Sequence, residues 1–179
     1  MGGWGARSEI QSLRVYTMEK YASLELDDHI VDAILDQAVE NGSIVYVKPR
    51  DSKNMENDLF AHAALYLAGW RFTVHRESEG HKNIDFIKRN GEYWEVKSPT
   101  ADGTSKDPTK FVQERLREAR HQYRSHPHAD EAHVRVVFNT KHTLVPDDVI
   151  EARLRSEAER QGIESVVMVN KRGELITIR

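Results

Sequence analysis

Residues 83–100 read NIDFIKRNGEYWEVKSPT, and this stretch decides the fold that we expect for the chain. Two runs of mixed apolar and polar residues flank Asn90 and Gly91, a pair that favours a β-hairpin turn. Residues two apart on a strand point to the same face, so Glu95 and Lys97 are expected to lie side by side on the returning strand.

The pairing register of this hairpin decides whether Asp85 joins Glu95. A two-residue loop would place Asp85 opposite Val96, and each face would then mix apolar and charged side chains. A three-residue loop, 89–91, closed by Gly91 in the left-handed conformation places Asp85 opposite Glu95. This register separates an apolar face (Ile84, Phe86, Trp94, Val96) from a polar face (Asp85, Tyr93, Glu95, Lys97). Because a one-residue slip turns every side chain over, we expect the three-residue loop, with its polar face open to water.

The composition predicts one globular domain. Of the 179 residues, 39% are hydrophobic and 31% are charged, and the net charge is −3. The apolar runs are far shorter than the roughly 20 residues that a membrane span needs, and the glycine-rich start MGGWGARSEIQS has no apolar segment typical of a signal peptide. The chain contains no cysteine, which leaves carboxylates and imidazoles as candidate metal ligands.

The order of the expected elements indicates an α/β fold with a mixed central sheet flanked by helices. Helical patterns occur over 28–40, 54–68, 108–124 and 147–161. Strand patterns occur over 43–47, 71–76, 84–88, 93–98, 134–138, 165–169 and 174–178. We expect residues 1–50 to form a linker and a small accessory helical segment. Residues 51–179 should form the main domain, with a core order α-β-β-β-α-β and an extra C-terminal helix and strands.

A basic segment follows the hairpin. Residues 104–128 contain six Lys or Arg against three acids, with three histidines in addition. A basic strip beside a carboxylate cluster favours a phosphodiester substrate. The candidate nucleic-acid contacts are therefore Lys106, Lys110, Gln113 and Arg117, although an ordinary solvated helix face shows the same pattern.

The order of elements, with Asp85 on one strand of the hairpin and Glu95 and Lys97 on the other, resembles the PD-(D/E)xK (restriction-endonuclease-like) nuclease superfamily. The resemblance implies a restriction-endonuclease-like core in which Asp85 is the first motif acid and Glu95 and Lys97 form the E-x-K. Many members carry a further glutamate on the preceding helix, which corresponds to Glu56 here.

The resemblance covers about residues 54–139. Many members also carry Gln or Lys on the helix after E-x-K, which matches Lys110 and Gln113. One departure is that Ile84 precedes the first acid, where the family pattern has a proline.

A more detailed sequence pattern, YWEVKSPT followed by a Lys/Arg-rich helix, is similar to that of the C-terminal nuclease domains of contact-dependent growth inhibition toxins and other polymorphic toxins. That resemblance implies delivery from a larger secreted or surface protein, action in the bacterial cytoplasm, and a cognate immunity protein as partner. It favours tRNA as the substrate, with DNA as the alternative.

A metal-dependent hydrolysis is the expected chemistry. Asp85 and Glu95 would bind Mg²⁺ or Mn²⁺, the cations that oxygen ligands prefer, while a nearby histidine would admit Zn²⁺. Lys97 would orient the attacking water or stabilise the charge that develops on phosphorus. Glu56 is the candidate third ligand, and Asp58 competes with it for that role.

Other interpretations remain open at this point. Among the histidines, His75, His81 and His121, only His81 stands in the segment that leads to Asp85, but a lone histidine is more often structural or exposed. A catalytically inactive nuclease fold that binds nucleic acid, or a protein-interaction domain, would also fit the composition. The Asp-Glu-Lys set speaks against both, because neither needs it.

Overall fold

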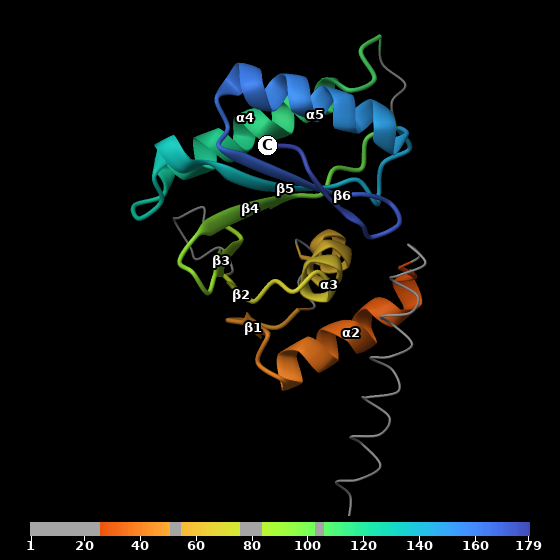
Figure 1. Ribbon diagram of the computed structural model, residues 1–179, viewed down its shortest axis with the longest axis vertical. Helices are drawn as coiled ribbons and strands as arrows, with labels where there is room; N and C mark the ends of the chain where they lie inside the picture. Colours follow the sequence, from red (N-terminus) through yellow and green to blue (C-terminus); the bar gives the residue numbers. More distant parts are fainter. Residues whose placement is uncertain (1–25, 51–54, 76–83, 103–105) are drawn as a thin grey trace, which may run out of the picture.

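The computed structural model in Figure 1 describes residues 26–50, 55–75, 84–102 and 106–179 and has the expected α/β architecture. The helices of the described part are α2 (Asp28–Glu40), α3 (Leu59–Leu67), α4 (Lys110–Ser125) and α5 (Asp147–Gln161), with single 3₁₀ turns η1 (Glu56–Asp58) and η2 (Glu131–His133). The strands are β1 (Ile44–Tyr46), β2 (Phe72–Val74), β3 (Phe86–Lys88), β4 (Tyr93–Lys97), β5 (Arg135–Asn139), β6 (Ser165–Val169) and β7 (Leu175–Thr177). None of the described helices has the length and apolar character needed to cross a bilayer.

The strands form one seven-stranded mixed sheet in which spatial order follows chain order, β1 to β7, among the described residues. The β2–β3–β4 segment is an antiparallel meander. Strands β4, β5 and β6 are parallel, with α4 and α5 as the crossover connections. The predicted core order is therefore present as α3-β2-β3-β4-α4-β5, and the predicted α5, β6 and β7 extend it.

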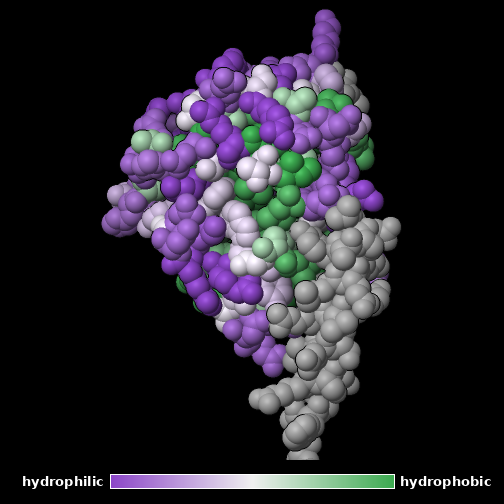
Figure 2. Space-filling view, viewed as in Figure 1, coloured by the Kyte–Doolittle hydropathy of each residue, from purple (hydrophilic) through white to green (hydrophobic). Residues whose placement is uncertain are grey.

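Helices cover both faces of the sheet, as Figure 1 shows, with α4 and α5 on one side and α2 and α3 on the other. Two buried clusters correspond to these layers. Alternation along the strands supplies both, since Val137 joins the α2/α3 cluster while its neighbours Val136 and Phe138 join the α4/α5 cluster. Figure 2 shows hydrophilic side chains over the α4/α5 layer and hydrophobic ones in the band between the layers.

Residues 26–50 do not form a separate accessory piece. Strand β1 pairs in parallel with β2, and Ile34, Leu35 and Ile44 are buried in the same cluster as the side chains of α3. The expected division after residue 50 therefore does not coincide with a break in the hydrophobic core.

The hairpin has the three-residue register. Phe86 lies opposite Trp94 and Ile87 opposite Tyr93, which puts Asp85 level with Glu95. The turn is closed by a hydrogen bond from the Gly91 amide to the Lys88 carbonyl (2.8 Å), with Gly91 at a φ of 90°. A positive φ of this size favours glycine, so the turn residues and the apolar pattern specify the same register.

The polar face of the hairpin is not open to water as expected. Only 2% of the Glu95 surface is exposed, and Tyr93 packs against the α4/α5 cluster. The physical reason lies in the strands beyond the hairpin: β4 is also paired in parallel with β5, and parallel sheets are covered by helices on both faces. Asp85, Glu95 and Lys97 therefore lie at the edge of a core.

Candidate active site

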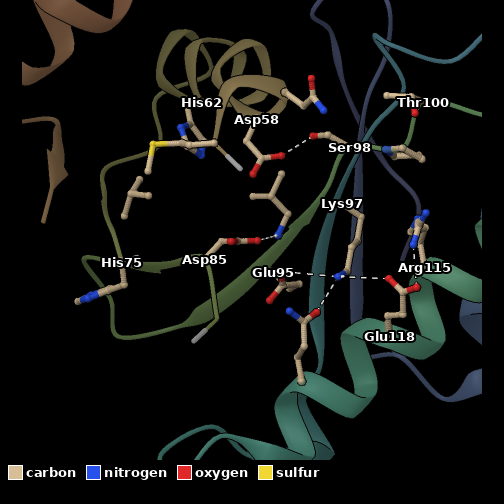
Figure 3. Close-up of a pocket in the computed structure, with 16 residues that line it drawn as sticks. Asp58, His62, His75, Asp85, Glu95, Lys97, Ser98, Thr100, Arg115 and Glu118 are labelled. Atoms are coloured by element: carbon tan, nitrogen blue, oxygen red, sulfur yellow. Dashed lines mark hydrogen bonds and ion pairs between the residues drawn. The ribbon is translucent and has the colours of Figure 1, made fainter. Parts of the chain in front are cut away.

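A cavity of about 520 Å³ lies at the C-terminal end of β4, between η1 and α4 (Figure 3). Its polar walls come from Asp58 of η1, Asp85 before β3, and Glu95 and Lys97 of β4. Helix α4 closes the opposite side with Arg115, Glu118 and Gln122. The structure thus brings together three of the predicted residues, Asp85, Glu95 and Lys97.

Asp85 stands where β3 leaves β4. Its carboxylate accepts a hydrogen bond from the Val96 amide (Oδ2 to N, 2.8 Å), and its carbonyl accepts one from the His75 amide (2.8 Å). The side chain therefore takes the place of a β-ladder partner at the point where the two strands separate, and its position is fixed by the backbone.

Glu95 is the most deeply buried acid of the cavity. Burial raises the pKa of its carboxyl well above the usual value, and the neighbouring Asp85 carboxylate raises it further. Its Oε2 atom is buried and has no hydrogen-bond partner among the described residues. The nearest cation is Lys97, whose Nζ lies 3.8 Å from Oε1. A buried carboxylate left with this little compensation is costly when ionised.

Asp58 is the third carboxylate. Its Oδ1 accepts a hydrogen bond from the Ser98 hydroxyl (2.6 Å). Burial raises the pKa of this carboxyl well above its usual value, and the charge of Asp85 raises it as well, while the bond from Ser98 acts in the opposite direction. Figure 3 shows Asp58, Asp85 and Glu95 along one side of the cavity.

Glu56 does not join these carboxylates, which corrects the sequence prediction. It is exposed and lines a different cavity with Asp32, Asp36 and Arg50. The prediction assumed one continuous α-helix from residue 54, but residues 56–58 form a 3₁₀ turn, with about three residues per turn. This change of period turns Glu56 away and brings Asp58, the competing candidate, to the cavity.

Lys97 is held from three sides. Its ammonium donates a hydrogen bond to Gln122 Oε1 (2.7 Å) and lies 3.8 Å from Glu118 Oε2, besides its contact with Glu95. The side chain is 13% exposed. Gln122 therefore orients a partly buried cation towards the carboxylates.

Helix α4 presents a different face to the cavity from the one predicted. Arg115, Glu118 and Gln122 line it, whereas the candidates Lys106, Lys110, Gln113 and Arg117 do not. The buried stripe of α4 consists of Val112, Leu116, Ala119 and Tyr123. Residues opposite a buried stripe point to solvent, so the side chains that reach a neighbouring strand are those that flank the stripe. At 100° per residue, Arg115 and Gln122 lie on one flank of the stripe and Gln113 on the other, so this rule alone would not have chosen the flank that reaches the cavity.

The three histidines considered from the sequence have different positions. His75 lines the cavity, His121 is exposed on α4 and does not, and His81 lies outside the described residues. His62, which was not selected as a site residue, also lines the cavity; its Nδ1 is 2.9 Å from the Tyr46 hydroxyl, and its buried Nε2 has no partner in the part of the chain described. Burial lowers the pKa of His62 to about 3, so this ring is neutral at physiological pH.

Comparisons with known proteins give one structural likeness. No protein-family model matches the sequence, and no curated protein matches it. A chain of the CdiA-CT/CdiI toxin and immunity complex from Burkholderia pseudomallei is similar over 77% of this chain and 99% of its own, with 20% sequence identity and a TM-score of 0.48. With a TM-score below 0.5, this likeness carries no conclusion about this protein, and the chemistry of the site rests on its own geometry.

The donor set fits a divalent metal ion. The cavity holds three carboxylates with a single lysine nearby, and one buried oxygen of Glu95 has no partner among the described residues. A hard divalent cation would compensate the negative charge of these groups. Among the described residues, no three His, Asp or Glu side chains stand close enough together to hold an ion as they are placed. The three carboxylates would have to move closer together to hold an ion.

Proposed function

We propose that this protein is a metal-dependent nuclease that hydrolyses phosphodiester bonds of nucleic acid. The observation that carries the proposal is the convergence of Asp58, Asp85 and Glu95 beside Lys97 in one cavity. Burial and mutual repulsion raise the pKa of Asp58 and Glu95, which is a cost without structural benefit. Clefts that hold acids perturbed in this way are characteristic of functional sites.

The three carboxylates are the proposed ligands. Asp85 is positioned by the backbone of β4, Asp58 by Ser98, and Glu95 offers an oxygen that no described group satisfies. A divalent cation held there would polarise the scissile phosphate and lower the pKa of a bound water. Mg²⁺ and Mn²⁺ suit this all-oxygen set; among the described residues that line the cavity, His62 and His75 carry the imidazole nitrogens that would suit Zn²⁺.

Lys97 acts on the reacting groups in this proposal. Its ammonium, fixed by Gln122 at 2.7 Å, lies 3.8 Å from Glu95, and the lysine side chain is 13% exposed. From there it orients the attacking water or stabilises the negative charge that develops on the phosphate.

Arg115 is the proposed contact for the substrate phosphate. It lies on the cavity wall and is paired with Glu118 at 2.7 Å, with both side chains more than 40% exposed. An exposed ion pair contributes at most about 1 kcal/mol, whereas a guanidinium binds a phosphate through two parallel hydrogen bonds. A phosphate therefore displaces Glu118 from Arg115 at little cost.

The sequence resemblance directs the choice of substrate and setting. The segment YWEVKSPT is similar to toxin nuclease domains, so we propose a toxin domain that is delivered from a larger protein, acts on tRNA in the bacterial cytoplasm, and has a cognate immunity protein. DNA is the second substrate to test.

The test is a cleavage assay on tRNA and on supercoiled plasmid with Mg²⁺, Mn²⁺ or EDTA. Asp58→Asn, Asp85→Asn and Glu95→Gln keep the side-chain shape and should each lower the rate by roughly a hundredfold or more. Glu56→Gln, an exposed acid outside the cavity, is the matched control and should cleave like the unmutated protein. Cleavage at the full rate by Glu95→Gln in EDTA would overturn the proposal. Binding of either substrate without any cleavage would replace it with a nucleic-acid-binding module.

A further inference from the structure

Asn139, the last residue of β5, is completely buried next to the candidate active site without lining it. Its Nδ2 donates to the Asn57 carbonyl (3.1 Å) and to Ser98 Oγ (3.1 Å). Its Oδ1 accepts from the Lys141 amide (3.1 Å), which fixes the orientation of the side-chain amide. Every hydrogen-bonding atom of this side chain is therefore in use.

The parallel pairing of β4 and β5 explains this position. Lys97 is paired with Phe138, so the next residues along each strand, Ser98 and Asn139, stand side by side. The ends of parallel strands meet at one edge of the sheet, and here that edge is the wall of the cavity.

The direction of the hydrogen bonds is also fixed. An amide nitrogen can only donate, so Ser98 Oγ accepts from Asn139 and its own hydrogen is directed to Asp58 Oδ1, 2.6 Å away. The relay therefore runs from Asn139 through Ser98 to the Asp58 carboxylate, and it presents a donor to that acid.

The same amide also anchors the turn that carries Asp58. The Asn57 carbonyl accepts hydrogen bonds from Asn139 Nδ2 and from His142 Nε2 (3.2 Å). The turn η1 is only three residues long; the Asp58 amide donates to the Met55 carbonyl (2.9 Å), and the Leu59 amide donates to the Glu56 carbonyl. Single 3₁₀ turns are weak alone, so η1 is held by its continuation into α3 and by the hydrogen bonds from Asn139 and His142 to the Asn57 carbonyl.

We propose that Asn139 is a positioning residue: through Ser98 and Asn57 it holds the Asp58 carboxylate beside Asp85 and Glu95. The inference rests on the proposed metal site for its functional consequence. Partners that orient metal ligands in this way typically change metal affinity by 10- to 100-fold when removed.

Asn170 provides a matched control. It is a second buried asparagine, directly after the neighbouring parallel strand β6, and its Oδ1 accepts backbone amides of the following turn, from Arg172 (3.0 Å) and Glu174 (2.9 Å). It shares the local capping role of Asn139, but these side-chain hydrogen bonds stay within its own turn, whereas those of Asn139 also reach Ser98 and Asn57. Asn139→Ala and Asn170→Ala are therefore comparable in lost packing and differ in the contact with Ser98.

The experiment compares these two variants, with Ser98→Ala as the milder change and Ser98→Thr as the variant that keeps the hydroxyl. Amide hydrogen exchange at Asp58 and Leu59 should be about tenfold faster in Asn139→Ala and unchanged in Asn170→Ala. Mn²⁺ affinity, measured by calorimetry, should fall by about 10- to 100-fold in Asn139→Ala and Ser98→Ala. Ser98→Thr, which keeps the hydroxyl, should bind Mn²⁺ as the unmutated protein does.

The outcomes separate this inference from the proposed function. Exchange at η1 and Mn²⁺ affinity that are the same in Asn139→Ala as in Asn170→Ala would overturn the positioning role. If the unmutated protein binds no Mn²⁺ and cleaves neither substrate, the proposed function fails, while the exchange rates at Asp58 still decide whether Asn139 holds η1.

Discussion

At the scale of single residues, the candidate site pairs a deep acid with a shallower cation on the same strand. Glu95 and Lys97 are two residues apart on β4 and share a face, but the Glu95 side chain is 3% exposed whereas the Lys97 side chain is 13% exposed. This difference in depth suits a division of labour in which the acid binds a cation and the lysine meets substrate.

Replacing Lys97 with methionine tests this division. Lys97→Met keeps the apolar stem and removes a cation that competes for the carboxylates, so Mn²⁺ affinity should be retained or increased. The single-turnover rate should nevertheless fall by about 10²–10⁴-fold, because the positioned proton donor or acceptor is lost. Lys88→Met, a lysine of β3 that lies over the Trp70 ring outside the cavity, should change neither quantity. A Lys97→Met enzyme with an unchanged rate would remove Lys97 from the proposed chemistry.

Two arginines of α4 distinguish the observed face of the helix from the predicted one. Arg115 lines the cavity and Arg117 does not. Arg115→Gln should weaken nucleic-acid binding several-fold and lower the slope of affinity against salt concentration by about one unit, while Arg117→Gln should leave both nearly unchanged. Fluorescence anisotropy in EDTA over a salt series measures this, and equal losses in the two variants would restore the basic strip as a general contact surface.

At the scale of elements, what could be predicted depended on whether a pattern is local. The residue range of α2 was predicted as about 28–40, and the helix spans Asp28–Glu40, because polar residues and Asn41-Gly42 mark its ends. The register of the β3–β4 hairpin was correct because the turn and the face pattern agree. Glu56 and the α4 candidates do not lie at the cavity because both placements depend on non-local packing: a 3₁₀ turn before α3, and the position of α4 over the sheet.

Gly91→Ala tests whether the turn or the burial of the apolar side chains fixes the register of the hairpin. Gly91 has a φ of 90° and no heavy atom within 4 Å of where a Cβ would lie, so alanine adds backbone strain of about 1–2 kcal/mol without a clash. Because the apolar side chains of the hairpin are buried, the register should survive and Mn²⁺ affinity should stay unchanged. Urea unfolding should show a loss of stability similar to that of Gly162→Ala, at the left-handed end of α5. Loss of metal binding in Gly91→Ala alone would mean that the turn, and not burial, sets the register.

At the scale of the whole molecule, covering both faces of the sheet places ionisable groups where water is scarce. Asp58 and Glu95 have raised pKa values because burial disfavours their charged forms. Burial has the opposite effect on His62, whose pKa falls to about 3. The native protein therefore binds more protons than the unfolded chain at the two carboxyls, and fewer at His62, so their contributions to the pH dependence of stability have opposite signs.

Comparing the unmutated protein with Glu95→Gln isolates the carboxyl contribution, since His62 is present in both. A carboxyl with a raised native pKa stabilises the fold below its unfolded pKa, about 4.3, and this stability is lost as pH rises towards the native pKa. In EDTA, the unfolding free energy of the unmutated protein minus that of Glu95→Gln should therefore fall from pH 5 upwards, by up to about 1.4 kcal/mol per pH unit. Urea titrations at pH 5, 6.5 and 8 measure this difference.

Mn²⁺ at pH 8 should stabilise the unmutated protein more than Glu95→Gln, because the cation compensates the negative charge of Glu95, which glutamine does not carry. A difference that stays constant with pH would show that Glu95 is ionised throughout this range. The buried carboxyl would then carry no ionisation cost for a metal ion to offset, and the proposed metal site would lose its main support.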